Sequence, residues 1–188
     1  MSMEITRCGW AAREGLEQEY HDEVWGVPVH DDKALFRMLM LEGQQAGLSW
    51  STILRKMDAL NDAYDGFDPA ILVQYGEAKV AELLGNPGII RNRLKILAAI
   101  GNARAYFALC ESHGSLDQFL WAYVDGAPVL NHWESLSQVP ASTPLSDRIS
   151  VDLKKLGFKF VGTTIVYAFL QAVGVVNDHL VSCAFRRA

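Results

Sequence analysis

The segment 143–173, TPLSDRISVDLKKLGFKFVGTTIVYAFLQAV, contains two helical patterns separated by a short break. Its opening threonine and proline are typical of a helix start, with Thr143 as the cap and Pro144 at the first helical position. We expect this helix to run to about residue 156, and a tight hairpin to follow over 157–162. A second helix should then run from 163 to about 173. The segment therefore predicts two helices joined by a short hairpin.

Helical periodicity also dominates the rest of the sequence. Apolar residues recur every three to four positions in four further stretches, which predict helices over 32–47, 49–64, 91–111 and 116–123. In the third of these helices, four residues are expected to face the core: Leu94, Leu97, Ala98 and Tyr106. Residues 125–144 contain three prolines and are expected to form the longest loop. Because no stretch alternates convincingly between apolar and polar residues, the sequence predicts an all-α fold.

Composition places the chain among ordinary globular proteins. Its 188 residues, 50% of them hydrophobic and 21% charged, are enough for one good-sized domain. No apolar run reaches the roughly 18 residues of a membrane span, and the N-terminal stretch lacks the apolar core of a signal peptide. Three cysteines, an odd number, favour a reducing compartment over a disulfide framework. We therefore expect a cytoplasmic protein without membrane contact.

The net charge of −5 is unevenly distributed. Residues 1–85 carry 15 acidic and 7 basic side chains, whereas residues 86–188 carry 7 acidic and 10 basic ones. An acidic protein is not the usual nucleic-acid binder, but a basic face in the C-terminal half could still contact phosphate groups. The charge distribution therefore neither excludes nor establishes binding to nucleic acid.

Four potential metal ligands lie near the two ends of the chain. Cys8 and His21 are close to the N-terminus, and His179 and Cys183 are close to the C-terminus. The second pair is four positions apart, which places both side chains on one face of a helical turn. Two thiolates and two imidazoles form a complete, structural zinc shell. Since such pairs also occur by chance and isolated cysteines are often packing residues, spacing alone leaves both interpretations open.

A carboxylate and several aromatic residues are candidates for a ligand pocket. Glu42 and Trp50 flank the predicted helix end at Gly47, and the N-terminal stretch adds Trp10 and Tyr20. An acid beside aromatic rings suits a flat, cationic or hydrogen-bonding ligand. The simpler interpretation is structural, with the glycine ending a helix and the rings filling the core.

The hairpin is a candidate phosphate site. Lysines precede it and lie within it, Gly157 and Gly162 bound it, and a helix begins at Thr163. Backbone N–H groups at a helix start bind phosphate, and glycines permit close approach. In the alternative, it is a tight turn between helices whose lysines are only solvated.

Taken together, these residues resemble the bacterial 3-methyladenine DNA glycosylase I family, within the helix-hairpin-helix glycosylase superfamily. The matching segments occur in order along nearly the whole chain: 7–10, 20–22, 25–26, 41–50, 88–91, 101–106, 157–164, 177–179 and Cys183. An ordered match of this extent is far more specific than any of its parts.

The resemblance implies one domain over residues 1–188, with two helical lobes and a helix-hairpin-helix motif at about 145–174. It also implies one structural zinc ion that ties the two ends of the chain together. The implied zinc ligands are Cys8, His21, His179 and Cys183.

The resemblance further implies a pocket for a damaged base. In this pocket Glu42 meets the excised base, Tyr20 and Trp50 stack on it, and Trp10 lies nearby. Relatives commonly carry a tyrosine where this chain has Glu17, so one aromatic contact to the base is missing here.

Two segments are implied to contact DNA. The turn after the helix of Glu42 lies near the gap left by the flipped nucleotide, and the hairpin anchors the DNA backbone. The residues concerned are Gly47, Leu48, Gly157, Lys159, Gly162, Thr163 and Thr164.

The implied activity is base-excision repair by a monomeric enzyme acting on double-stranded DNA. It flips N3-methyladenine out, hydrolyses the N-glycosidic bond, releases free 3-methyladenine and leaves an abasic site, without lyase activity. Because the methylated base is already a good leaving group, Glu42 is expected to recognise it electrostatically, with activation of water as a lesser role. Asp178 is expected to support a zinc ligand or to act as a cap. The alternative is a non-catalytic module that binds alkylated DNA.

Overall fold

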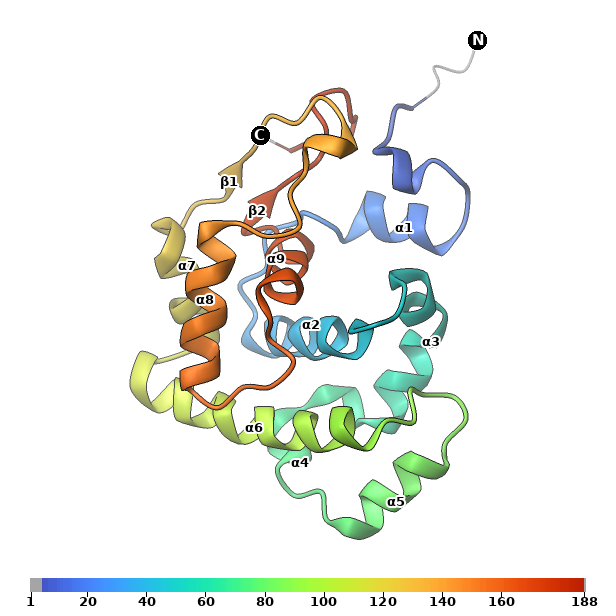
Figure 1. Ribbon diagram of the computed structural model, residues 1–188, viewed down its shortest axis with the longest axis vertical. Coiled ribbons are helices and arrows are strands. Elements are labelled where there is room, and N and C mark those ends of the chain that lie inside the picture. Colours follow the sequence, from blue (N-terminus) through green and yellow to red (C-terminus); the bar gives the residue numbers. More distant parts are fainter. Residues whose placement is uncertain (1–4, 188) are drawn as a thin grey trace.

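The computed structural model describes residues 5–187, and nearly all of its regular structure is helical (Figure 1). Residues 1–4 and 188 of the predicted domain lie outside the described residues. The α-helices are α1 (Leu16–Glu23), α2 (Asp32–Gln45), α3 (Trp50–Ala63), α4 (Pro69–Leu72), α5 (Glu77–Gly85), α6 (Arg93–His113), α7 (Leu116–Trp121), α8 (Pro144–Lys155) and α9 (Thr163–Ala172). Short 3-10 turns cover Gly9–Ala11, Asp65–Phe67, Ala122–Val124 and Leu136–Gln138. The predicted, mostly helical class is confirmed.

One short strand pairing departs from the all-α prediction. The strands β1 (Val129–Leu130) and β2 (Val176–Asn177) pair in parallel over two residues each. The Val129 N–H donates to the Val175 carbonyl at 2.9 Å, which attaches the long loop before α8 to the segment after α9. Two residues are too few to show an alternating pattern, so the sequence did not predict this contact.

Local signals account for where the helices begin. Asp31 and Ser49 each accept a backbone N–H from the first turn of α2 and α3, and Thr143 forms a reciprocal capping pair with Ser146 at α8. The predicted bounds of the long helices agree with the structure to within two residues. The helix α1 was not predicted, because its sequence LEQEYHDE is mostly polar and no side chain caps its start.

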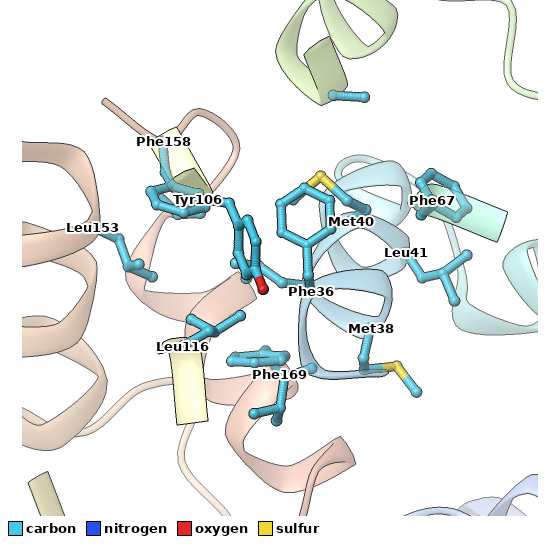
Figure 2. Packing of buried hydrophobic residues seen from close by; sticks show 14 of the residues in the cluster. Phe36, Met38, Met40, Leu41, Phe67, Tyr106, Leu116, Leu153, Phe158 and Phe169 are labelled. Carbon is cyan, nitrogen blue, oxygen red and sulfur yellow. The ribbon is translucent and has the colours of Figure 1, made fainter. Parts of the chain in front are cut away.

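The helix α2 contacts α3, α6, α7 and α9 and forms the centre of the fold. Its side chains are buried on several sides, including Leu35, Phe36, Leu39 and Leu41, each at most 1% exposed. Figure 2 shows Phe36 beside Tyr106 of α6, with ring centroids 5.2 Å apart. Burying each large apolar side chain contributes about 1.5–3 kcal/mol. The C-terminal end of α2, which carries Glu42, is therefore held by the core.

The inner face of α6 is only partly the one predicted. Ala98 and Tyr106 are buried as expected. Leu94 and Leu97 are 70% and 40% exposed, whereas Lys95 and Asn102 are buried. The rest of the prediction was wrong because apolar periodicity assumes that polar side chains face water, and these two make hydrogen bonds inside the protein.

The two ends of the described chain meet. The Ala184 N–H donates to the Thr6 carbonyl at 2.9 Å, so the segment after β2 lies against the segment before α1. Within residues 5–187, no helix has both the length and the apolar character needed to cross a membrane.

Candidate active site and metal centre

A cavity of about 340 Å³ lies among α1, α2, α3, α9 and the loop before α8. The four predicted pocket residues, from separate parts of the chain, meet in it: Trp10, Tyr20, Glu42 and Trp50. The other lining residues are Glu17, Trp25, Gln45, Leu136, Val139, Ala168, Gln171 and Asp178. Of all the lining side chains, three are acidic, namely Glu17, Glu42 and Asp178, and none is lysine or arginine. The cavity therefore favours a cationic ligand over an anionic one.

Glu42 provides the most unusual group of the cavity. Its side chain is 3% exposed, and its Oε2 atom has no hydrogen-bond partner among the described residues. Burial away from water favours the neutral acid and raises the pKa of Glu42 to about 8. A buried carboxyl oxygen without a partner costs free energy. The group is therefore a strong candidate for contact with a ligand.

Aromatic rings border this carboxyl group. The ring centroids of Tyr20 and Trp50 are 5.2 Å apart, with their planes at 50°. Burial and the nearby Glu42 raise the pKa of Tyr20 well above its ordinary value, so its hydroxyl stays protonated. The Trp50 Nε1 donor also lacks a partner among the described residues. The cavity thus offers one free acceptor and one free donor beside flat apolar surfaces.

Asp178 lines the same cavity, but both of its carboxylate oxygens already accept hydrogen bonds from other side chains. Its Oδ1 accepts hydrogen bonds from Asn131 Nδ2 and Trp133 Nε1 at 2.7 Å each. Its Oδ2 accepts from Gln171 Nε2 at 2.8 Å and from the Tyr167 hydroxyl. None of these partners belongs to the cysteine–histidine cluster, and none is a backbone N–H, so neither the predicted support of a zinc ligand nor the predicted capping role is found among the described residues. Asp178 instead joins α9 to the loop that follows β1.

The four predicted metal ligands form one buried cluster. Cys8, His21, His179 and Cys183 place their ligand atoms within 4.8 Å of one another. Cys183 Sγ lies 3.6 Å from His21 Nε2 and 3.4 Å from His179 Nδ1. Cys8 Sγ lies 3.8 Å from His179 Nδ1. Ligands of one tetrahedral zinc ion are roughly 3.3–3.8 Å apart, given the usual Zn–S and Zn–N bond lengths, so the cluster has nearly these dimensions.

Neighbouring groups orient both imidazole rings. His21 Nδ1 lies 2.7 Å from Asp22 Oδ1, and His179 Nε2 lies 3.1 Å from the Trp25 carbonyl. These contacts leave the other nitrogen of each ring facing the cluster, as in metal-binding histidines. Burial lowers the pKa of His179 to about 4, which keeps this ring neutral as a ligand must be. A Cβ at Gly26 would lie 3.0 Å from His179 Nε2, so glycine permits the close approach.

The chemistry of this donor set fits zinc. Burial raises the pKa of the Cys8 thiol, so a thiol this far from water needs a bound cation to ionise. Two thiolates neutralise a divalent ion, and two imidazoles complete four ligands with no open position.

The predicted turn after α2 lies next to the cavity. Gly47 has a φ of +78°, a conformation that favours glycine. Leu48 is 40% exposed although it is apolar. Because Gln45 directly before this turn lines the cavity, an exposed leucine stands close to the pocket.

The hairpin is arranged as predicted, between α8 and α9. Gly157 has a φ of +97°, and Lys159 and Thr164 are exposed. The helix α9 begins without a side-chain cap, so its first N–H groups lack an internal partner of the usual kind. The Thr163 hydroxyl donates to Asp147 Oδ1 at 2.6 Å, so its side chain is engaged within the protein.

Sequence reasoning missed several lining and supporting residues. Asp22 orients His21, and its position next to a candidate ligand was a usable signal. Leu136 and Val139 enter the cavity from the long loop. No local pattern marks these two, because the path of that loop depends on its attachment through β1.

Solved structures of related proteins share this fold. A crystal structure of a 3-methyladenine DNA glycosylase I superposes with a TM-score of 0.92 at 49% identity, covering 95% of this chain and 98% of that one. A substituted 3-methyladenine DNA glycosylase I solved in complex with 3-methyladenine superposes with a TM-score of 0.93 at 36% identity, covering 97% and 98%. The fold is that of the DNA glycosylase class of enzymes.

Sequence comparison narrows this class to one family. The methyladenine glycosylase family model matches residues 10–187. The DNA-3-methyladenine glycosylase 1 of Escherichia coli (strain K12) is 49% identical over 179 residues, which cover 95% of this chain and 96% of that relative. The chain therefore belongs to the bacterial 3-methyladenine DNA glycosylase I family, as the resemblance in its sequence indicated.

Proposed function

We propose that this enzyme excises N3-methyladenine from duplex DNA by hydrolysing the N-glycosidic bond, releasing free 3-methyladenine and leaving an abasic site. The observation that carries the proposal is the buried Glu42 carboxyl group in a cavity bordered by Tyr20 and Trp50. The 3-methyladenine held by the related structure supports this choice of base.

Charge explains how such a pocket selects the damaged base. Methylation at N3 gives adenine a positive charge, which an ionised Glu42 and the faces of aromatic rings stabilise. Without a ligand, burial favours the neutral carboxyl group. A cationic base supplies the missing counter-charge and lowers the pKa of Glu42. Normal adenine brings no charge, so the cost of a buried carboxylate stays uncompensated and binding is weaker.

The positive charge of the methylated base also makes the N-glycosidic bond easier to break. A cationic base leaves readily, so a strong general acid is not needed. The damaged base also pairs and stacks poorly, which lowers the few kcal/mol that flipping costs. Glu42 recognises and stabilises the charged base, with activation of water as its second role. Among the described lining residues there is no lysine, which supports hydrolysis by a monofunctional glycosylase over attack by an amine.

The remaining parts of the proposal concern DNA and metal. The α8–α9 hairpin serves as a helix-hairpin-helix motif whose backbone N–H groups contact a DNA phosphate. Gly47 and Leu48 lie near the gap left by the flipped nucleotide. A zinc ion held by the cysteine–histidine cluster supplies a structural cross-link between the ends of the chain. The enzyme acts as a monomer in the cytoplasm.

A non-catalytic module that binds alkylated DNA would use the same cavity and hairpin, so release of free base discriminates between the two functions. Zinc-loaded protein is incubated with methylated duplex DNA, and the released bases are separated chromatographically. Glu42→Ala removes the proposed contact, and Glu82→Ala removes an exposed carboxylate from α5 as a control. Selective release of 3-methyladenine, reduced only in Glu42→Ala, supports the proposal. Binding without release by wild-type protein would contradict it and favour the binding module.

A further inference from the structure

Two buried polar residues of α6 each hold one of the segments proposed to contact DNA. We infer that Lys95 and Asn102 are positioning residues that fix the spacing between the turn after α2 (residues 46–49) and the hairpin (residues 157–162). The inference builds on the proposed function, because it assigns these residues a part in holding duplex DNA.

Lys95 holds the turn after α2. Its side chain is buried, and its Nζ donates hydrogen bonds to the carbonyl groups of Gln44 and Ala46 at 2.7 Å each. The last carbonyl groups of a helix lack partners within the helix, and a cation at this end also interacts favourably with the helix dipole. Lys95 therefore fixes the direction in which the chain leaves α2 toward Leu48.

Asn102 holds the hairpin. Its Nδ2 donates to the Lys159 carbonyl at 3.0 Å, and its Oδ1 accepts the Lys159 N–H at 2.7 Å. The next residue, Phe160, has a φ of +54°, in the left-handed region that is unfavourable for a residue with a side chain. The paired amide thus stabilises a hairpin conformation that the chain would not favour by itself.

The two contacts lie on one face of one continuous helix. Seven residues make about two helical turns, so the two side chains project from the same side of α6, roughly 10 Å apart along its axis. The α2 helix and the hairpin meet at this face, since a Cβ at Gly43 would lie only 3.4 Å from the Cβ of Phe160. A single rigid helix therefore sets the distance between the two segments.

Burial of these polar groups calls for a reason beyond packing. Lysine and asparagine are costly to bury, and apolar residues would fill the same volume at lower cost. In the proposed function, the hairpin contacts the DNA backbone while the turn after α2 lies near the gap left by the flipped nucleotide. A fixed spacing lets both contacts form without further ordering of the protein on binding.

The test compares binding of duplex DNA with binding of free base. Lys95→Met and Asn102→Leu remove the hydrogen bonds at similar volume, and Lys95→Arg retains the cation. Lys79→Met removes one positive charge from the surface of α5 as a control. Each protein is titrated with free 3-methyladenine by tryptophan fluorescence and with duplex DNA containing an abasic-site analogue, and kcat and KM are measured on methylated duplex.

We expect the two variants that lose hydrogen bonds to bind duplex about tenfold more weakly, while their affinity for free 3-methyladenine changes less than about twofold. Lys95→Arg should recover part of the duplex affinity, and Lys79→Met should match wild type. Thermal unfolding identifies a variant that does not fold, in which case Asn102→Ala or Lys95→Gln takes its place.

Two outcomes would overturn the inference. Folded variants that bind duplex like wild type would show that the spacing is not needed. Equal losses for duplex and free base would show a purely structural role. If wild-type protein itself neither binds nor cleaves duplex DNA, the proposed function fails and the inference fails with it.

Discussion

Replacing Glu42 by glutamine is expected to remove a pH-dependent cost from the folded protein. Burial raises the pKa of this carboxyl group from 4.5 to about 8. The folded protein therefore holds the proton more strongly than the unfolded chain does. The stabilisation that comes from the bound proton is complete below about pH 4.5 and is lost as the pH rises to about 8. Glutamine cannot ionise, so the unfolding free energy of the variant does not fall in this way as the pH rises.

The size of the effect follows from the pKa. At about 1.4 kcal/mol per pKa unit, the change from 4.5 to about 8 costs the wild type about 1 kcal/mol at pH 5 and about 4 kcal/mol at pH 8. The difference in unfolding free energy should therefore move in favour of Glu42→Gln by about 3 kcal/mol between these pH values. In a protein of 188 residues this equals about 6–12 °C in Tm.

Urea unfolding of both proteins from pH 5 to pH 8 measures this difference. Any constant cost of burying an amide, and any titration of the cysteine–histidine cluster, cancels in the comparison. Glu17→Gln is the matched control, because it removes a carboxyl group that lines the same cavity but is only partly buried. If the difference between Glu42→Gln and wild type is constant over this range, Glu42 is not destabilised by burial and the recognition argument is refuted.

The kcat/KM for release of 3-methyladenine should rise as the pH approaches about 8, because Glu42 of the free enzyme must ionise before it can stabilise a cationic base. A pH–rate profile that is flat up to pH 8 would contradict this expectation. Metal analysis should find one zinc ion per chain in wild type and in Cys110→Ala, and much less zinc in Cys183→Ala. The Tm of Cys183→Ala should fall by several degrees. Full zinc content in Cys183→Ala would exclude the assigned site. Glu17→Tyr should tighten binding of free 3-methyladenine about fivefold, because one aromatic contact contributes about 1 kcal/mol. If a fluorescence titration shows unchanged or weaker affinity, the side chain at this position does not reach the base.

Much of the helical framework could be predicted from local sequence. Asp31, Ser49 and Thr143 act within one turn of the helices that they cap, so short-range chemistry is enough to place these helix starts. The helix α1 was missed because its side chains are mostly polar. It is stabilised by contacts with distant parts of the chain, which no local pattern reports.

The face that a helix turns inward was less predictable than the helix itself. In α6, apolar periodicity correctly pointed to Ala98 and Tyr106. It also pointed to Leu94 and Leu97, which are exposed, and it missed the buried Lys95 and Asn102. A buried polar residue is stable only when its hydrogen-bond partners are present. Those partners belong to α2 and the hairpin, which are far away in sequence.

The sequence by itself determined the helical class, most helix bounds, the family resemblance and the residue types available for a metal centre and an acidic, aromatic pocket. Only the tertiary structure decided which of these residues meet. Cys8 and His179 are 171 positions apart and lie in contact distance, and Leu136 reaches the cavity from an irregular loop. Periodicity and capping report interactions within a few turns, but contacts between distant segments depend on how all helices share one buried core. The same packing takes Glu42 out of water, and so gives an ordinary carboxyl group its unusual pKa.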